Sequence, residues 1–503
     1  MKRLLAVTAA CVATAVVAAG CGGTTHKSGG LGESGAALVT SNALAYVAVD
    51  SDLGSSQWQK LDALLKKFPI RDRLLKELQR ALAEKQLDYD RDVKPALGPE
   101  VDLAVEAGGS VQDIAYAYLW KPGSMEKAKA LVHKLDETSP PASATRVVDG
   151  WLVVADKQEM IDRVLKGSGS SLADDSKFKE AIGKLPDDAL VKAYANGRRL
   201  SDLLGAIFGG TSQASFSGFA QATAAGGGSS PYGLDNLDWL AGSVFAKDDG
   251  LGLEGEIKGT NGSPFALDQY ESKLISGVPA DALAFISFHG KPGFDPFSQA
   301  RQNPAFSEGL RQVEQALGMS LDRVFALFEH ETVFYLRRGP GLPEFSLVLE
   351  APDTTQALTT IDRLANRVAE YTHARIGTDK QDGLDVKTLT YGPVTLRWAG
   401  FDGRVLLTTG ATGITDYRSG GAKLGDDSTF KDALDGAGAS TKNGGLVYVN
   451  LTDAVQLVQS YAGLESGELP ADVRENLKPL RSFVAYGTSS GDLTKLAAFL
   501  AVK

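Results

Sequence analysis

The sequence predicts an α+β fold of two tandem homologous halves, each a largely antiparallel sheet packed with helices. Three observations lead to this prediction. Segments of the first half recur in the same order in the second half, short apolar runs are joined by hairpin signals, and helical periodicity alternates with those runs. Hydrophobic residues make up 43% and charged residues 23% of the 503 residues, so the composition is that of a folded chain.

The internal repetition defines the domain organisation. Five matched pairs are colinear: Ala43–Val49 with Ala282–Phe288, Trp58 with Phe297, Asp149-Gly150 with Asp402-Gly403, Leu172–Lys179 with Leu424–Lys431, and Tyr194–Asn196 with Tyr448–Asn450. Five matches in one order indicate a duplication. We therefore predict a first repeat over residues 37–260 and a second over residues 272–503, joined near a Gly/Ser-rich segment.

The sequence of the first repeat predicts alternating strands and helices. An apolar strand over 43–49 precedes a helix that Ser55 or Ser56 caps and that Pro69 ends. Asp149-Gly150 between two apolar runs predicts a tight hairpin, because Asp-Gly suits the positive backbone angles of such a turn. The remaining elements are a leucine-rich helix around 74–82, strands at 101–106 and 114–120, helices at 125–135, 157–165 and 176–183, a strand at 190–195, a helix at 198–207 and a last hairpin around 246–250. The stretch from Gly209 to Gly233 predicts a mobile loop.

The N-terminal segment predicts the location of the protein. A basic Met1–Arg3 precedes an apolar run from Leu4 to Ala19, which is too short for a permanent membrane span. Small residues then lead to Cys21, as in a bacterial lipobox, although Ala18 stands where Leu or Val is usual. We expect residues 1–20 to be a lipoprotein signal peptide, Cys21 to be lipidated and residues 21–36 to be a flexible tether. The protein would then be extracytoplasmic and lipid-anchored to the bacterial cell membrane.

The pattern resembles a bacterial family, domain-of-unknown-function family 3352. The resemblance rests on Trp58 in a helix ending Phe68-Pro69, on Asp92–Glu100 with its Lys-Pro and Leu-Gly-Pro elements, and on Asp174–Phe178. The second half departs from it, because Asp322–Glu331 lacks those elements. The resemblance implies a secreted or anchored protein of about this length and supplies no catalytic residues.

Composition excludes several kinds of partner and cofactor. Cys11 and Cys21 are the two cysteines, and both would leave or be lipidated, so the mature chain offers neither a disulfide nor a thiol ligand. A net charge of −10 argues against nucleic acid as a partner. The expected contact is with the membrane through Cys21, and a protein or lipid partner stays unidentified. No cofactor is expected.

Two enzyme motifs occur and fail on their context. Gly487–Gly491 matches the Gly-x-Ser-x-Gly nucleophile elbow, but no histidine follows it and its first-half counterpart lacks Ser, so we interpret it as a hairpin turn. Gly250–Gly255 matches a dinucleotide fingerprint but opens an alternating strand rather than a helix.

The acidic residues and the histidines are also interpreted without a functional site. Asp88–Asp92 begins like a calcium loop but lacks the later Gly and Glu. The remaining polar signals are interpreted as helix caps at Asp174-Asp175, Asp426-Asp427, Asn196 and Asn450, and as chance histidines at His26, His133, His289, His330 and His373, which lack ligand spacing. We therefore predict no catalytic, cofactor-binding or metal-binding residue, and Cys21 as the lipidation site.

Two classes of function remain open. The first is a non-catalytic envelope lipoprotein, a binding or scaffolding module of unknown ligand, with a carrier of an apolar ligand such as a lipid as its alternative form. The second is an extracytoplasmic hydrolase whose acid and base meet only in the fold, from positions such as Asp50, Glu100 or Asp113. The absence of a paired nucleophile and base in the sequence favours the first, so we expect no enzyme.

Overall fold

A computed structural model of the chain describes residues 30–108, 113–138, 140–209, 236–263, 266–293, 295, 297, 301, 304–465 and 469–503. The predicted signal peptide, Cys21, His26 and residues 210–233 of the predicted loop lie outside these ranges. Within the ranges, no helix combines the length and the apolar character that a membrane crossing needs.

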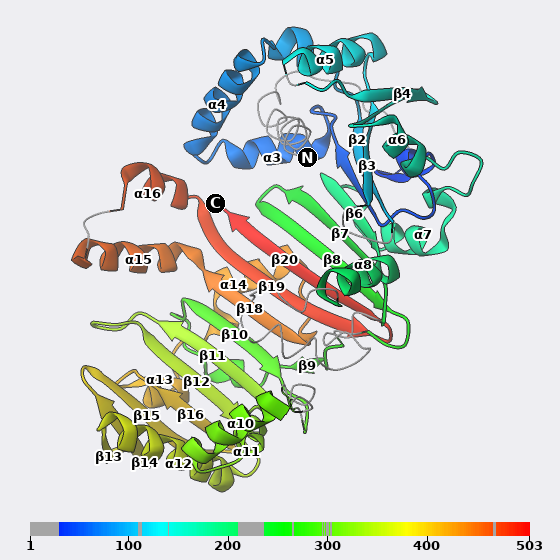
Figure 1. Cartoon of the computed structure of the whole chain (residues 1–503). Coiled ribbons are helices and arrows are strands. Elements are labelled where there is room, and N and C mark those ends of the chain that lie inside the picture. The colour runs from blue at the N-terminus through cyan, green and yellow to red at the C-terminus, as the bar shows by residue number, and fades with distance from the viewer. Residues whose placement is uncertain are drawn as a thin grey trace.

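In the part of the chain that the structure describes, eighteen strands form one antiparallel sheet (Figure 1). Its order is β4-β5-β3-β2-β1-β6-β7-β8-β20-β19-β18-β10-β11-β12-β16-β15-β14-β13. The first-half strands are β1 (Ala45–Asp50), β2 (Glu100–Ala107), β3 (Ile114–Lys121), β4 (Ala144–Val148), β5 (Trp151–Ala155), β6 (Val191–Asn196), β7 (Leu237–Lys247) and β8 (Gly250–Gly259). The second-half strands are β10 (Ala284–His289), β11 (Glu331–Arg337), β12 (Glu344–Glu350), β13 (Arg375–Gln381), β14 (Leu384–Tyr391), β15 (Val394–Phe401), β16 (Arg404–Thr408), β18 (Gly445–Asn450), β19 (Leu480–Ser490) and β20 (Leu493–Val502).

Helices connect the strands and cover the sheet. In the first half they are α2 (Glu33–Ala36), α3 (Ser56–Leu65), α4 (Ile70–Glu84), η1 (Tyr89–Val93), α5 (Met125–Thr138), α6 (Gln158–Val164), η2 (Leu172–Asp174), α7 (Ser176–Gly183) and α8 (Gly197–Gly209). In the second half they are η4 (Leu274–Gly277), α10 (Pro304–Leu317), α11 (Leu321–Phe325), η6 (Ala326–Phe328), α12 (Thr354–Thr372), α13 (Gly413–Arg418), η7 (Leu424–Asp426), α14 (Ser428–Ala437), α15 (Leu451–Glu465) and α16 (Ala471–Leu477). A separate two-stranded sheet pairs β9 (Tyr270–Glu271) with β17 (Lys442–Asn443).

The two halves meet through β8 and β20, which lie side by side at the centre of Figure 1. Each strand is ten residues long and closes a hairpin, β7–β8 or β19–β20. Their antiparallel register places Glu254 opposite Ala497, and each of these is the fifth residue of its strand. The contact is therefore self-complementary about a pseudo-two-fold axis, as in an isologous dimer interface.

Each half has the same aromatic centre. In the first half, Phe178 of α7 lies edge-on between Tyr46 and Tyr194, with ring centroids 5.7 and 5.2 Å away. In the second half, Phe430 of α14 lies edge-on to Phe285 and Tyr448, at 6.2 and 4.9 Å. All six rings are buried.

The predicted fold class and tandem halves are confirmed. The Asp-Gly hairpins form as expected, with φ of 47° at Asp149 and 47° at Asp402. The second half has one more hairpin at its outer edge. Strands β16 and β15 take the places that β5 and β4 have in the first half, and the β13–β14 hairpin extends the sheet beyond them. The boundaries at 37–260 and 272–503 stay a prediction.

The predicted tether over residues 21–36 is wrong for its last part. Leu31 packs against the first-half core, Gly35 and Ala36 are buried in α2, and the Gly32 amide donates to Glu100 Oε1 at 3.0 Å. The segment folds because Leu31 and Ala36 pack into the first-half core and the buried Glu100 carboxylate accepts from the Gly32 amide.

We expect Phe178→Ala and Phe430→Ala each to lower the free energy of unfolding by about 3–5 kcal/mol, because each removes a ring from an equivalent packed centre. Chemical denaturation measures the loss. Tyr371→Ala, whose side chain is 91% exposed, is the control and should change stability by less than about 0.5 kcal/mol. A loss at only one of the two phenylalanines would contradict the equivalence.

Candidate functional site

The first strong polar feature is a buried carboxylate at the start of one strand in each half. Glu100 begins β2 and accepts from the Gly32 amide and, at 3.4 Å, from Ser34 Oγ. Glu331 begins β11 and accepts from the amides of Lys273 and Leu274 at 2.9 and 3.2 Å. Burial raises the pKa of Glu100 against these hydrogen bonds. Both carboxylates hold the segment that enters their half, which is a structural role.

A second buried acid, Asp102, lies near Glu100 in the first half. Asp102 is 1% exposed, and Tyr46 donates its hydroxyl to Asp102 Oδ2 at 2.5 Å. Burial, followed by the nearby charge of Glu100, raises the pKa of Asp102 well above its usual range. Burial likewise raises the pKa of Tyr46. Both residues belong to strands of the sheet, and Tyr46 is part of the first-half apolar core, so these groups lie against packed side chains.

The three positions considered for a hydrolase do not converge. Asp50 lies opposite Glu100 in the β1–β2 register, but its carboxylate accepts from Ser55 Oγ at 2.5 Å and from the Asp52 amide at 2.9 Å. Burial raises the pKa of Asp50 to about 7. Asp113 lies beyond the other end of β2 and pairs with Arg163.

The motif positions have the structural roles that their context indicates. Ser489 Oγ accepts from the Leu267 amide at 2.9 Å and bonds Thr494, within the β19–β20 hairpin. The glycine-rich match opens β8, where a side chain at Gly252 would collide with the Phe245 ring. That close approach, rather than a phosphate, explains the glycine.

The acidic pairs and the asparagines cap helices. Asp175 accepts from the first-turn amides of α7, and Asp427 does so for α14. Asn196 and Asn450 accept from amides three residues on, at 3.2 and 3.1 Å. Asp88 likewise accepts from the Arg91 amide at the start of η1, and Asp92 pairs with Arg91 and Lys134.

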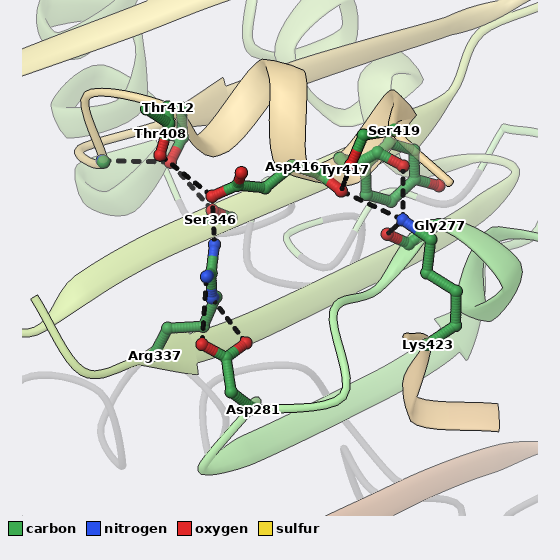
Figure 2. A network of polar contacts seen from close by, with 11 residues as sticks. Gly277, Asp281, Arg337, Ser346, Thr408, Thr412, Asp416, Tyr417, Ser419 and Lys423 are labelled. Atoms are coloured by element: carbon green, nitrogen blue, oxygen red, sulfur yellow. Dashed lines mark hydrogen bonds and ion pairs between the residues drawn. The ribbon is translucent and has the colours of Figure 1, made fainter. Parts of the chain in front are cut away.

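An ion-pair network joins α13 to the sheet in the second half (Figure 2). Arg337 of β11 lies between Asp281 and Asp416, with nitrogen–oxygen distances of 2.8 Å to both. Burial opposes its charge, but the hydrogen bonds to the two carboxylates outweigh burial and raise the pKa of Arg337. Lys423 donates to the carbonyls of Gly277, Asp416 and Tyr417 and so ties the end of α13 to η4.

The first half carries the same ion pair with its charges exchanged. Glu106 of β2 pairs with Arg163 of α6 where Arg337 of β11 pairs with Asp416 of α13. The strand positions correspond because Leu44 and Leu283 donate to the carbonyls of Val105 and Leu336, each one residue before the charged residue. Each half therefore has an ion pair that links the sheet to a helix. The acid is on the strand in the first half and on the helix in the second.

Two polar pockets occupy equivalent places in the halves, where the helix capped by Asp175 or Asp427 meets the helix that follows the Asn196 or Asn450 strand. The first has a volume of about 470 Å³ and is lined by Ala107, Gly108, Lys177, Asn196, Arg198, Arg199, Asp202 and Leu203. The second has a volume of about 400 Å³ and is lined by Thr429, Asn450, Thr452, Asp453, Arg481 and Lys503. Basic side chains outnumber acidic ones in both.

The structure brings together two histidines that sequence spacing did not relate. His289 ends β10, His330 immediately precedes β11 and Glu350 ends β12, and one ligand atom from each lies within 4.8 Å of the others. The sequence gave no signal because three separate strand ends supply the three residues. Of the other histidines in the described ranges, His133 has an exposed side chain that pairs with Glu137 on α5, and His373 is the residue that follows α12.

The family model described as "Protein of unknown function (DUF3352)" matches residues 4–132 and 124–502. The chain belongs to this family. No curated protein matches the chain. Among solved structures, crystal forms IV, III and I of TP0453 are similar over 45% of this chain and 76%, 92% and 75% of theirs, at 10%, 8% and 11% identity. The TM-scores of these three structures against this DUF3352 protein are 0.23, 0.23 and 0.21.

The raised pKa of Asp50 gives a pH-dependent prediction. A carboxyl whose folded pKa is about 7 rather than 3.8 contributes stability at low pH, and that contribution is lost as the pH rises through 7. Asp50→Asn keeps the hydrogen-bonding capacity without the charge. The variant should therefore gain stability relative to the wild type between pH 4 and pH 8, by at most about 4 kcal/mol.

Urea denaturation at each pH measures this difference. Asp72→Asn, at a position whose side chain is 81% exposed, is the control and should show a much flatter difference. A stability difference for Asp50→Asn that stays constant with pH would contradict the buried, protonated carboxyl.

Proposed function

We propose that this DUF3352 protein is a non-catalytic lipoprotein of the bacterial envelope, a binding or scaffolding module that Cys21 anchors on the extracytoplasmic side of the membrane. The anchoring part rests on the sequence, where Met1–Arg3 and the apolar run lead to Cys21. Two acyl chains on one cysteine would hold the protein stably, since each buried methylene contributes about 0.8 kcal/mol.

The binding part rests on one observation, the polar pocket that occurs at the equivalent place in each half. A ligand pocket needs a few convergent polar groups. Arg198 and Arg199 supply cations in the first pocket, and Arg481 and Lys503 supply them in the second. A ligand with anionic groups fits this lining best.

The non-catalytic part is supported by how the acids are used. Asp50, Glu100 and Glu331 accept local hydrogen bonds that hold turns and entering segments, and none of the three lines either pocket. Within the second pocket, Asn450 Nδ2 donates to Asp453 at 2.7 Å, which completes a helix start.

One observation favours a carrier of an apolar ligand as the second candidate. Ile286, Phe334 and Phe345 follow one another on the same face of β10, β11 and β12, and Ile286 and Phe345 are each 42% exposed. Phe334 stacks on Phe288 and tilts against Phe345. Such an apolar strip offers a surface for hydrocarbon.

We expect Cys21→Ser to release the protein from membranes, because a serine oxygen replaces the sulfur that would carry the lipid. Fractionation of cells and intact-mass measurement of the product test this. A Cys11→Ser variant is the matched control and should stay membrane-bound and lipidated. Full lipidation and membrane retention of Cys21→Ser would contradict the anchor.

The pocket hypothesis predicts that the pocket of either half can hold a ligand. Protein extracted from its own membranes should carry a molecule with anionic groups, detectable by native mass spectrometry. Arg199→Ala combined with Arg481→Ala should lose it, while Arg80→Ala, at an exposed side chain of α4, should keep it. No such molecule on the wild type, or an apolar lipid that the double variant keeps, would contradict this proposal, and the second result would favour the carrier.

A further inference from the structure

One row of residues crosses three neighbouring strands at the end of the second-half sheet. His289 of β10 lies opposite Glu331 of β11, and the β11–β12 register places Glu350 in the next position of the row. His330 precedes Glu331 in a bend and joins this row. The ligand atoms of His289, His330 and Glu350 all lie within 4.8 Å of one another, and the three side chains are half-buried.

The neighbouring groups orient these side chains. His289 Nδ1 lies 2.7 Å from the Gly290 carbonyl oxygen, so the proton belongs on Nδ1 and Nε2 keeps a free lone pair. The His289 ring lies 5.3 Å from the Tyr270 ring and meets the His330 ring edge-on at 6.3 Å. These contacts fix the imidazole before any ligand arrives.

The carboxylates of Glu331 and Glu350 have different roles. Glu331 is 2% exposed and is fully engaged by the segment Ser272–Leu274, so it supports the row from below. Among the described residues, Glu350 receives one long side-chain hydrogen bond, 3.4 Å, from the Glu331 amide. Lys273 Nζ lies 3.9 Å from Glu350 Oε1, but the Lys273 side chain is 77% exposed and can be displaced.

The first half shows what the same row does without histidines. The residues at the equivalent register positions are Asp50, Glu100 and Lys121, and Pro99 stands in place of His330. Glu100 and Glu331 correspond, but the first half supplies a positive charge of its own through the Lys121 ammonium. The second half has an acid at that position, together with two imidazoles. Where the first half has a built-in cation, the second half therefore has a set of cation ligands.

We propose that His289, His330 and Glu350 bind a divalent transition-metal ion of the Zn²⁺ class. Two imidazole nitrogens and one carboxylate oxygen suit zinc and its neighbours, whereas Ca²⁺ and Mg²⁺ prefer oxygen ligands alone. Ligand atoms on a tetrahedral zinc ion lie roughly 3.3 Å apart, so side chains already within 4.8 Å need only close at their tips. Three protein ligands leave one position for water or for a group of a partner.

The sequence predicts no metal-binding residue, so this site is proposed from the structure alone. The proposal does not depend on the function proposed for the two pockets. The lysine of the first-half row also predicts that the metal binds once per chain. The duplicated body would thus carry one metal and two pockets.

The test is titration of Zn²⁺ into the full-length protein, purified without a histidine tag and stripped with a chelator, by isothermal calorimetry. We expect one ion per chain and a higher melting temperature with zinc, because a ligand that binds only the folded state stabilises it. His289→Ala and His330→Ala should each weaken binding at least about 100-fold, since even an outer-shell change costs 10- to 100-fold. His133→Ala, at an exposed side chain of α5, should bind as the wild type does.

Glu350→Gln guards against a trivial loss of fold, because it keeps the shape of the side chain and removes only its charge. It should unfold at the wild-type temperature without zinc and lose the zinc-dependent rise. Replacing zinc with Co²⁺ should give the visible spectrum of nitrogen and oxygen ligands, and His330→Ala should change it. Absence of saturable zinc binding, equal binding by the row variants and the wild type, or preference for Ca²⁺ would each overturn the proposal.

Discussion

The pairing of β8 with β20 is the contact on which the rest of the architecture depends. A sheet edge ten residues long presents a row of unpaired amides and carbonyls that invites association. Here each half covers the edge of the other, from the pair Gly250–Ala501 at one end of the contact to the pair Lys258–Leu493 at the other. We call this β8–β20 contact the seam. Side chains add to its backbone hydrogen bonds, since Lys495 Nζ lies 2.9 Å from Glu254 Oε2 across it.

The seam also organises the helices around it. Trp58 and Leu64 of α3 pack in one cluster with Ala246 of β7 and Val502 of β20, so a first-half helix rests on a second-half strand. Asn476 of α16 accepts from the amide at the start of α4 at 2.7 Å. The two halves therefore form one body around a pseudo-two-fold axis. Differences between them stand out against that symmetry, as in the exchanged ion pairs and the histidine row.

Local signals in the sequence predicted most of the elements correctly. Asp149-Gly150 and Asp402-Gly403 specify their turns by backbone preference alone, and Asp175 and Asp427 cap their helices through amides two or three residues away. The seam was not predictable in this way, because nothing within β8 states which edge it meets. The folding of Gly30–Ala36 was not predicted for a similar reason: its polar Gly/Ser composition suggests a linker, and the Gly32 amide finds its acceptor in the distant Glu100.

The candidate sites divide along the same line. The spacing of His289 and His330 resembles no metal motif, since their meeting depends on strand register rather than on sequence separation. The two pockets likewise depend on how two helices meet in each half. Sequence reasoning could reject false motifs, because those are local, but it could not assemble sites from separate strand ends.

Amide hydrogen exchange, read residue by residue in the intact protein, tests the central claim most directly. If β8 and β20 pair as one sheet, their amides that face the seam should exchange as slowly as those of β1, a strand that has neighbours on both sides. Fast exchange of those amides, like that of the outer strand β13, would contradict a single continuous sheet.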